Sequence, residues 1–484
     1  MVPSMENHVL WSLSNVMTGV GPVIGGYLTN ANWRYCFVLS VGTAALTIPT
    51  IFLLRKDLKP GSVSLSHPSG GQRRVQALRS GLVSLDFGGI LLFTAGVALI
   101  ILGTAWGGST FPWSSAGVIT SLVIGSVLLV CFAVYESSFE PGRYLSRRLP
   151  KTIPMIPFTL LRNKDVGLVC LIAAATGTAL YSVFYFIGIY FTLVEAYPAS
   201  KAGTQLLYYV PGLGIGVYAA IFLCNVWPRQ TFWPLFLGTV VETGGIAALT
   251  YAVRSRHHTL VNIMMIVAGA GTGARFMPSN LHLAGMFRDQ LAPVYSILRF
   301  SLPFGGTLAL TIMGAVFQNQ MAVYFGDLGS DNSTGFSLHN QAALEAINQL
   351  PQAQQDVVRS RGATATMWSF VSILPFLCLS VLTSLGLGNV WISKKGKAES
   401  SAGATTAAPA VLSNTSHETN QSQEIDVAGS RQDEKHEHPE QTTGLSDTGR
   451  RIETVEGAQA QVIRSIYLLA LIKGTTRSIQ AVAE

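Results

Sequence analysis

The sequence predicts an all-α membrane protein, a polytopic bundle of about ten transmembrane helices. Three observations predict this class. Only 12% of the 484 residues are charged, whereas soluble domains contain about 25%. Hydrophobic residues make up 49% of the chain and glycine occurs 48 times. The apolar residues gather in runs of about twenty, which is the length that a helix needs to cross a bilayer.

The predicted spans follow one another with few long interruptions. A short turn joins the first two, and a second pair follows a basic loop. Four further runs are rich in glycine or aromatic residues, and a polar stretch separates the last two. Membrane helices tolerate the Gly and Pro within these runs, since neighbouring helices satisfy or pack against the backbone that they expose. The ten spans are 9–28, 35–54, 87–105, 116–135, 166–192, 204–226, 232–252, 260–282, 294–318 and 364–388.

The distribution of Lys and Arg predicts the orientation. Placing the first turn, LTNANWRYC, outside leaves seventeen basic residues in the inner segments and six in the outer ones. Arg254 and Arg256 are two of those six and run against the trend. This bias is typical of membrane proteins. It indicates that the net charge of +7 serves interaction with anionic lipid headgroups and not binding of nucleic acid.

Two polar parts complete the chain. Residues 319–363 are expected to form an extracellular loop with some helical spacing, broken at Pro351. Asn332 begins an NST sequon within it, a candidate glycosylation site. Residues 393–484 are rich in Ser, Thr, Gln, Glu and Gly, which predicts a disordered cytoplasmic tail. Its late run VIRSIYLLALI is too short to span and is expected to be a surface-lying or partner-dependent helix.

The first span carries the most informative motif, VMTGVGPVIGGYLTNANWRYCF, with Gly21, Pro22, Gly25 and Gly26. Glycines at this spacing expose backbone along one helix face, which ordinary helix packing also explains. The pattern resembles the antiporter signature on the fifth helix of drug:proton antiporters of the major facilitator superfamily. The match covers only the core GPxxGG, because Met17 and His8 stand where the signature has two further glycines.

Further segments resemble the fourteen-helix pumps of fungi: WRYCF the start of the sixth helix, LGTAWGGSTFPWSS the turn between the seventh and eighth, and RFSLPFGGTLALTIMGAVFQN the thirteenth. The resemblance covers about residues 9–390 and implies a major facilitator fold that lacks the first four helices, with a truncated N-terminal half. It implies four parts: a remnant of the N-terminal bundle (1–54), two linker helices with cytoplasmic basic loops (55–164), a C-terminal six-helix bundle (165–392) and the tail (393–484).

Charged residues inside the spans are candidates for function, because burying them in lipid is costly. Glu242 and Arg275 lie in the middle of consecutive spans, where antiparallel helices can pair them. In one interpretation Glu242 carries a proton and Arg275 is its partner or contacts substrate, and in the other they form a structural ion pair. The family topology implies that Arg275 lines the cavity and that Glu242 is peripheral. Asp86 is predicted to cap the helix that follows it.

Aromatic residues are candidates for lining a substrate cavity. Tyr181 and Tyr185 share partly common faces of the fifth span, although core packing or an interfacial belt explains them equally well. Tyr208 is a further candidate, together with its neighbour Tyr209. Arg299 lies near the inner end of its helix, where it can extend toward the membrane surface, contact a neighbouring carbonyl group or contact substrate.

Other functions find no support in the sequence. The runs GLGIG (212–216) and GAGTG (269–273) lie inside apolar helices and lack the strand and acidic residue of a dinucleotide site. There is no Walker motif, no GxSxG elbow and no His/Cys spacing typical of a metal site. The five cysteines lie in or beside apolar runs and are expected to pack there. We therefore expect neither an enzyme nor a cofactor or metal.

The resemblance implies a proton-coupled transporter that exports hydrophobic drugs, toxins or secondary metabolites by alternating access. Its expected partners are the lipid bilayer, a small hydrophobic substrate and protons, with no nucleic acid, and we expect a monomer. The expected location is the plasma membrane, with the vacuolar membrane as an alternative. Two other functions stay open: a siderophore or nutrient transporter of the same superfamily, and a non-transporting membrane remnant whose tail docks partners.

Overall fold

The computed structural model describes residues 21, 23–54, 84–108, 110–140, 142–148, 152, 154–287, 290–328, 351–391, 462–463 and 466–472. Within these residues, nine helices are long and apolar enough to cross a membrane. They coincide with nine of the ten predicted spans, so the all-helical polytopic fold is confirmed. The first predicted span lies largely outside the described residues, although 23–32 are helical.

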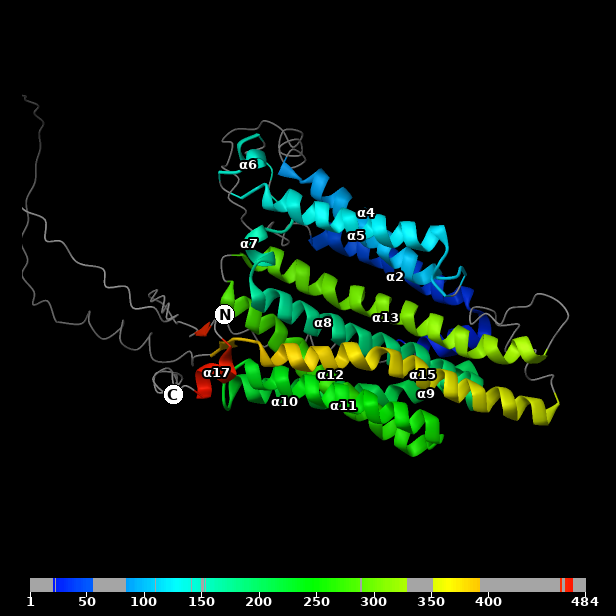
Figure 1. The fold of residues 1–484 in the computed structure, drawn as a ribbon. Coiled ribbons are helices and arrows are strands. Elements are labelled where there is room, and N and C mark those ends of the chain that lie inside the picture. Colours follow the sequence, from blue (N-terminus) through cyan, green and yellow to red (C-terminus); the bar gives the residue numbers. More distant parts are fainter. Residues whose placement is uncertain are drawn as a thin grey trace, which may run out of the picture.

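The N-terminal helices lie beside the main bundle (Figure 1). They are α2 (Arg34–Leu54), α4 (Phe87–Trp106) and α5 (Ala116–Ser137). Small residues bring α4 and α5 together, since a Cβ at Gly125 would lie 2.9 Å from the carbonyl oxygen of Gly96. On its other side α4 reaches the main bundle, where the rings of Phe93 and Phe300 lie 4.9 Å apart.

The cap predicted at Asp86 is confirmed. Its side chain accepts a hydrogen bond of 2.9 Å from the backbone N–H of Gly89, in the first turn of α4. The Tyr135 hydroxyl of α5 donates to the same carboxylate oxygen at 2.8 Å. One buried carboxylate therefore caps α4 and ties it to α5. Two short helices, α6 (Tyr144–Arg148) and α7 (Phe158–Leu161), follow α5 in the chain before the main bundle begins.

The main bundle is built around α8, which packs against α12, α13 and α15. Two π-helical turns, η1 and η2, continue the α8 span beyond Ser182. On the far side of α12, helices α10 and α11 complete the bundle. Its elements are α8 (Lys164–Ser182), η1 (Val183–Ile187), η2 (Tyr190–Val194), α9 (Ala199–Gln205), η3 (Leu206–Tyr208), α10 (Tyr209–Asn225), α11 (Phe232–Ser255), α12 (His258–Met286), α13 (Leu291–Leu328) and α15 (Gln352–Leu385).

The two last long helices extend further than the apolar runs predict. Helix α13 continues to Leu328 and α15 begins at Gln352, after Pro351 at its N-cap. The prediction of a polar loop over 319–363 was therefore too wide at both ends. An apolar run marks the thickness of the hydrocarbon layer, whereas the helix itself continues into polar sequence such as QAQQDVVRS.

We call the end of the bundle where α8 and α11 begin and α15 ends the inner end. There β1 (Asn389–Val390) pairs antiparallel with β2 (Val462–Ile463). Helix α17 (Tyr467–Ile472) follows β2 and lies at the same end (Figure 1). The prediction of disorder over the whole tail thus does not hold for these residues, because they find an apolar surface at the inner end. Residues 392–461 lie outside the described part of the chain.

Candidate functional site

Helices α11 and α12 meet closely in the middle of the bundle because glycines stand at their contact. A Cβ added at Gly245 or at Gly238 of α11 would lie 2.8 Å from atoms of α12, which for Gly238 is Cγ of Arg275. A Cβ at Gly271 of α12 would overlap the backbone of Glu242. Real Cβ atoms do not approach this closely, so the two backbones lie as near as helix geometry allows.

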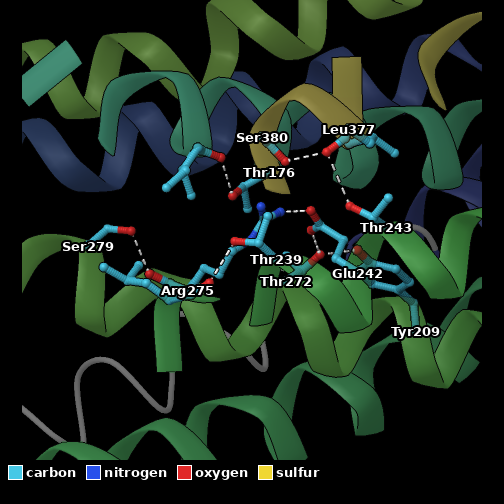
Figure 2. Close-up of polar contacts among 12 residues, drawn as sticks. Thr176, Tyr209, Thr239, Glu242, Thr243, Thr272, Arg275, Ser279, Leu377 and Ser380 are labelled. Atoms are coloured by element: carbon cyan, nitrogen blue, oxygen red, sulfur yellow. Dashed lines mark hydrogen bonds and ion pairs between the residues drawn. The ribbon is translucent and has the colours of Figure 1, made fainter. Parts of the chain in front are cut away.

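This close approach joins Glu242 of α11 to Arg275 of α12 in an ion pair (Figure 2). Both side chains are fully buried, with 0% of each exposed. A carboxylate and a guanidinium at such a position are each costly to bury alone, and their pairing offsets much of that cost. The structure therefore brings together the two intramembrane charges that the sequence singles out.

Two hydroxyl groups extend the pair toward α10. Thr272 of α12 donates a hydrogen bond to Glu242 through its hydroxyl. The Tyr209 hydroxyl of α10 lies 2.6 Å from the same Thr272 oxygen. Since Thr272 has only one hydroxyl hydrogen and gives it to the carboxylate, Tyr209 is the donor in the second bond. A continuous polar row thus crosses from α10 through α12 to α11 (Figure 2).

The guanidinium of Arg275 keeps unused hydrogen-bonding capacity. Its Nε and Nη1 atoms are buried and have no hydrogen-bond acceptor among the described residues. Thr176 of α8 and Thr239 of α11 lie around it in Figure 2, but their hydroxyls donate to carbonyl oxygens of their own helices, at 2.9 and 2.6 Å. Arg275 therefore has donors left for one further acceptor oxygen.

The glycine runs that resemble nucleotide loops pack against each other instead. A Cβ at Gly212 or Gly216 of α10 would overlap the backbone of α12, and one at Gly269 or Gly273 would overlap the backbone of α10. The two runs thus interlock along the α10–α12 contact. This packing places Tyr209 beside Thr272 and explains the glycines without any bound phosphate.

The predicted cavity residues do not join this network. The ring of Tyr181 packs against Gly306 of α13 and is partly buried. Tyr185 and Tyr208 are 40% and 43% exposed, and Arg299 is exposed as well. These four side chains lie on the surface of the bundle or close to it.

In the glycine-rich motif of the first span, the structure gives a contact to Gly26. A Cβ there would lie 2.6 Å from the carbonyl oxygen of Ala199 at the start of α9 and 3.4 Å from Gly203. Gly21 and Gly25 have no atom within 4 Å of such a Cβ. Pro22 lies outside the described residues, as does the predicted glycosylation site Asn332.

Two members of the network have only weak signals in the sequence. Thr272 lies in the run GAGTG, one helical turn before Arg275. Because a hydroxyl group is uncharged, its burial costs far less than that of a charge, and the sequence alone does not mark it as a functional residue. The pair Tyr208 and Tyr209 is ambiguous, and the structure buries Tyr209 in the network while it leaves Tyr208 outside. Counting three or four residues back from each intramembrane charge would have found Thr272.

A second buried polar cluster lies at the inner end. His282 of α12 shares a hydrogen bond of 2.8 Å with the Thr231 hydroxyl through its Nδ1 atom. The backbone N–H of Val390 donates to the same hydroxyl at 3.3 Å. The Asn389 side chain donates to that of Gln230 at 2.7 Å. These bonds join the end of α12, the α10–α11 turn and β1.

Neither cluster has the ligand set of a metal centre among its described residues. Among the residues that the structure describes, no group of three or more His, Cys, Asp or Glu side chains is placed to hold an ion. The donors around Glu242 and Arg275 are hydroxyl groups and one carboxylate, which suit protons and polar oxygen atoms better than a transition metal.

Comparison with known proteins agrees with this picture of a helical membrane protein. The efflux pump dotC of Dothistroma septosporum is 25% identical over 74% of this chain and 58% of its own length. The efflux pump mokI of Monascus pilosus is 27% identical over 64% and 55%. The MFS-type transporter VdtG of Byssochlamys spectabilis is 25% identical over 74% and 62%. The chain thus spans about three fifths of the length of these relatives.

The family model described as "Fungal trichothecene efflux pump" matches residues 8–373. The match includes α2 to α13 and most of α15, and with them the Glu242–Arg275 pair and the whole polar row around it. Since this is more than half of the chain, the match identifies a transporter family and agrees with the expectation that the protein is not an enzyme. The chain belongs to the family of fungal trichothecene efflux pumps.

Proposed function

We propose that this chain exports small hydrophobic toxins or other secondary metabolites in exchange for protons, by alternating access. The observation that carries the proposal is the fully buried Glu242–Arg275 pair inside the bundle of an efflux-pump family member. A buried carboxylate that changes its charge is the simplest means of linking a proton to a conformational change. The substrate class follows from the description of the family, and the direction from the same source.

In the proposed mechanism, Glu242 carries the proton. While Glu242 is ionised, Arg275 neutralises its charge and Thr272 donates a hydrogen bond to it. Protonation removes the negative charge and leaves Arg275 as a buried cation without a counterion. The bundle then favours a conformation in which Arg275 meets water or another polar partner, so the proton shifts the balance between two states.

Arg275 is the proposed contact for substrate. Its Nε and Nη1 atoms have no hydrogen-bond acceptor among the described residues, so they can donate to a carbonyl, ether or hydroxyl oxygen of a bound metabolite. Substrate would bind while Glu242 is ionised, because the ion pair then holds Arg275 with these two atoms available. Protonation of Glu242 breaks the pair and turns Arg275 toward water, so that substrate leaves. Proton and substrate would then bind alternately, which is what exchange requires.

We propose that the aromatic surface formed by α8, η1 and η3 contributes apolar contacts to the cavity. Tyr185 and Tyr208 expose large rings on the surface of the bundle, and Tyr181 lies partly buried on α8. Planar apolar compounds bind well against such rings. Arg299 remains a proposed polar contact near the inner end of α13. The rocking of two helix bundles about a shared site would expose these residues alternately.

Transport measurements in proteoliposomes test the proposal. The protein is reconstituted, and proton flux is followed with a pH-sensitive dye after addition of a trichothecene. We expect Glu242→Gln to abolish substrate-stimulated proton flux while the protein still assembles and inserts. The matched control is Glu136→Gln, because Glu136 is also a buried carboxylate in a span but accepts from a backbone N–H instead of pairing with Arg275.

The outcomes separate the interpretations of the pair. If Glu242→Gln keeps full substrate-stimulated proton flux, the pair is structural and the proposed role of Glu242 is wrong. If the unaltered protein shows no transport in either direction under a pH gradient, the transport function itself is wrong. Accumulation of substrate on the side from which protons leave supports exchange, whereas accumulation on the side that protons enter indicates import.

We further propose that the inner end faces the cytoplasm of the cell, in the plasma membrane. The bias of Lys and Arg toward the inner segments supports this orientation. Asn332 would then lie outside and Asn414 and Asn420, which also begin sequons, would lie inside. Glycan attached at Asn414 or Asn420 but not at Asn332, detected by mass spectrometry, would reverse the orientation.

A further inference from the structure

The described residues of the C-terminal segment, 462–463 and 466–472, lie against the inner end through backbone and side-chain contacts. Its β2 strand adds to β1, pairing Val462 with Val390 and Ile463 with Asn389. The backbone N–H of Tyr467 then donates to the Leu387 carbonyl oxygen at 3.0 Å. Addition of a strand to a free edge is a recurrent way in which proteins bind peptides.

Tyr467 is the anchor of this segment. Its side chain is fully buried, with its ring 4.8 Å from that of Phe232 and 5.7 Å from that of Trp391. Ala470, one turn later, is also buried, whereas Leu469 between them is 51% exposed. The short helix thus presents one face to the bundle, although six residues are too few to form a stable helix alone.

The surface beneath Tyr467 is an apolar cluster in which several helices meet. A segment far away in the sequence therefore completes the core of the inner end. Besides Tyr467 and Ala470, its buried members are Leu160, Val166, Val169, Ile172, Ala173, Phe232, Leu235, Leu283, Val294, Leu298, Leu387 and Trp391.

We propose that residues 462–472 act as an intramolecular peptide ligand of the inner end, which holds the end of α15 against the α10–α11 turn while it is bound and frees both when it leaves. The bound surface is a peptide-binding site that takes an extended dipeptide followed by a tyrosine anchor. This inference is independent of the proposed transport, since it concerns how the inner end is held together.

The size of the contact makes the segment exchangeable. Two pairs of strand residues and one aromatic anchor form a small interface, far below that of a permanent complex. Residues 392–461 connect the segment covalently to the bundle, so that its local concentration at the site is high even when its intrinsic affinity is low. Release and return are therefore both accessible to the same chain.

The contacts continue from the segment into the bundle. The ring of Trp391 packs edge to face against that of Tyr467, and the Trp391 backbone forms an isolated bridge with Gln230 in the α10–α11 turn. The Cys224 thiol at the end of α10 is fully buried and donates to the Gln230 carbonyl oxygen at 3.8 Å. Release of the segment loosens Trp391 and Gln230 in turn, which uncovers Cys224. A buried thiol does not react, so Cys224 reports whether the site is occupied.

The experiment measures maleimide labelling of Cys224 in the full-length protein. Cys36, Cys131, Cys170 and Cys378 are first replaced by Ser, and labelling is followed in inverted membrane vesicles by mass shift. We expect Tyr467→Ala to accelerate labelling about tenfold or more. A tenfold rise in the fraction of molecules with an uncovered Cys224 requires a loss of only about 1.4 kcal/mol in the binding free energy of the segment. Leu469→Ala, on the exposed face of the same helix, should label like the parent, as should Tyr467→Phe, which keeps both ring contacts.

A truncated chain ending at residue 461 provides the second arm. It should label as fast as Tyr467→Ala, and a synthetic peptide of residues 462–472 in excess should return labelling to the slow parental rate. Equal rates for Tyr467→Ala, the truncated chain and Leu469→Ala would overturn the proposal. Fast labelling that the peptide cannot slow would also overturn it, since it would indicate a lost fold and not an empty site.

A mixing control separates one chain from two. Tyr467→Ala protein is reconstituted with an excess of protein that has an intact segment but no cysteine. Protection of Cys224 by the second chain at the densities used for the parent would show docking between copies and contradict the intramolecular arrangement. Fast labelling that the second chain leaves unchanged supports it.

Discussion

Gly271 of α12 faces Glu242 of α11 with no room for one additional carbon atom between them. The absence of a side chain at one residue therefore sets the position of the charge on the other. The ion pair to Arg275 and the hydrogen bond from Thr272 both depend on this spacing, because they start from α12. The stability of the bundle and the geometry of the site are thus linked at one backbone contact.

Replacing Gly271 by Ala should lower the melting temperature of the detergent-solubilised protein. The added methyl group must push α11 and α12 apart, at a cost of about 1–3 kcal/mol. Gly244→Ala is the matched control, because a Cβ at Gly244 of α11 meets no atom within 4 Å. That substitution should leave the protein unchanged or slightly more stable. Equal melting temperatures for the two variants would show that the α11–α12 contact is looser than the structure indicates.

Removing one member of the ion pair should cost more than removing both. Arg275→Gln leaves the Glu242 carboxylate buried without its counterion, which we expect to destabilise the protein by about 3–5 kcal/mol. Combining it with Glu242→Gln removes that charge and should recover a large part of the loss. Thermal unfolding of the single and double variants in detergent measures the coupling. A double variant as unstable as the sum of its single changes would contradict the pairing.

The two neighbouring tyrosines should differ when each loses its hydroxyl. Tyr209→Phe removes the donor to Thr272 inside the bundle and should cost about 0.5–1.5 kcal/mol, because the buried Thr272 hydroxyl then loses the hydrogen bond that it accepts. Tyr208→Phe should change stability by less than about 0.5 kcal/mol, since its side chain lies at the surface. Chemical unfolding curves of both variants give the comparison. A larger effect at Tyr208 would mean that the polar row does not include α10.

The stability of the protein should depend on the acceptor oxygens of Asp86 more than on its negative charge. Asp86→Ala removes both the cap of α4 and the acceptor for Tyr135, and we expect a loss of about 1–3 kcal/mol. Asp86→Asn keeps an acceptor oxygen and should retain most of the stability. Limited proteolysis of the loop that precedes α4 provides the measurement, because a frayed first turn is cleaved faster. Cleavage at the same rate in all three proteins would contradict the cap.

Much of the fold can be read from the sequence because the bilayer imposes a length on apolar runs. Nine spans lie where the runs predict them, and the two charges in mid-span meet as adjacent antiparallel helices allow. The ends of α13 and α15 were missed, since polar residues can prolong a helix beyond the hydrocarbon layer. Hydropathy contains no information on where such a helix stops.

The remaining differences concern contacts between distant or uncharged residues. Thr272 has no charge, so its burial leaves no sign in the sequence, and its role follows only from its position between Tyr209 and Glu242. Tyr467 meets Phe232 across more than two hundred positions of the chain. Residue spacing and composition do not predict this contact, because it depends on which apolar surface of the folded bundle is left uncovered at the inner end.

The row of Tyr209, Thr272 and Glu242 has one more property, which follows from the number of its hydrogens. With Glu242 ionised, every hydrogen in the row points toward α11. When the carboxyl group takes up a proton it can donate to Thr272, which then donates to Tyr209, so that both hydrogen bonds of the row point toward α10 and the hydrogen of the Tyr209 hydroxyl leaves the row. The direction of the hydrogen bonds at Tyr209 of α10 thus depends on whether Glu242 of α11 is charged. Reversal of two hydrogen bonds needs no movement of heavy atoms, so this signal can pass between three helices before the bundle changes conformation.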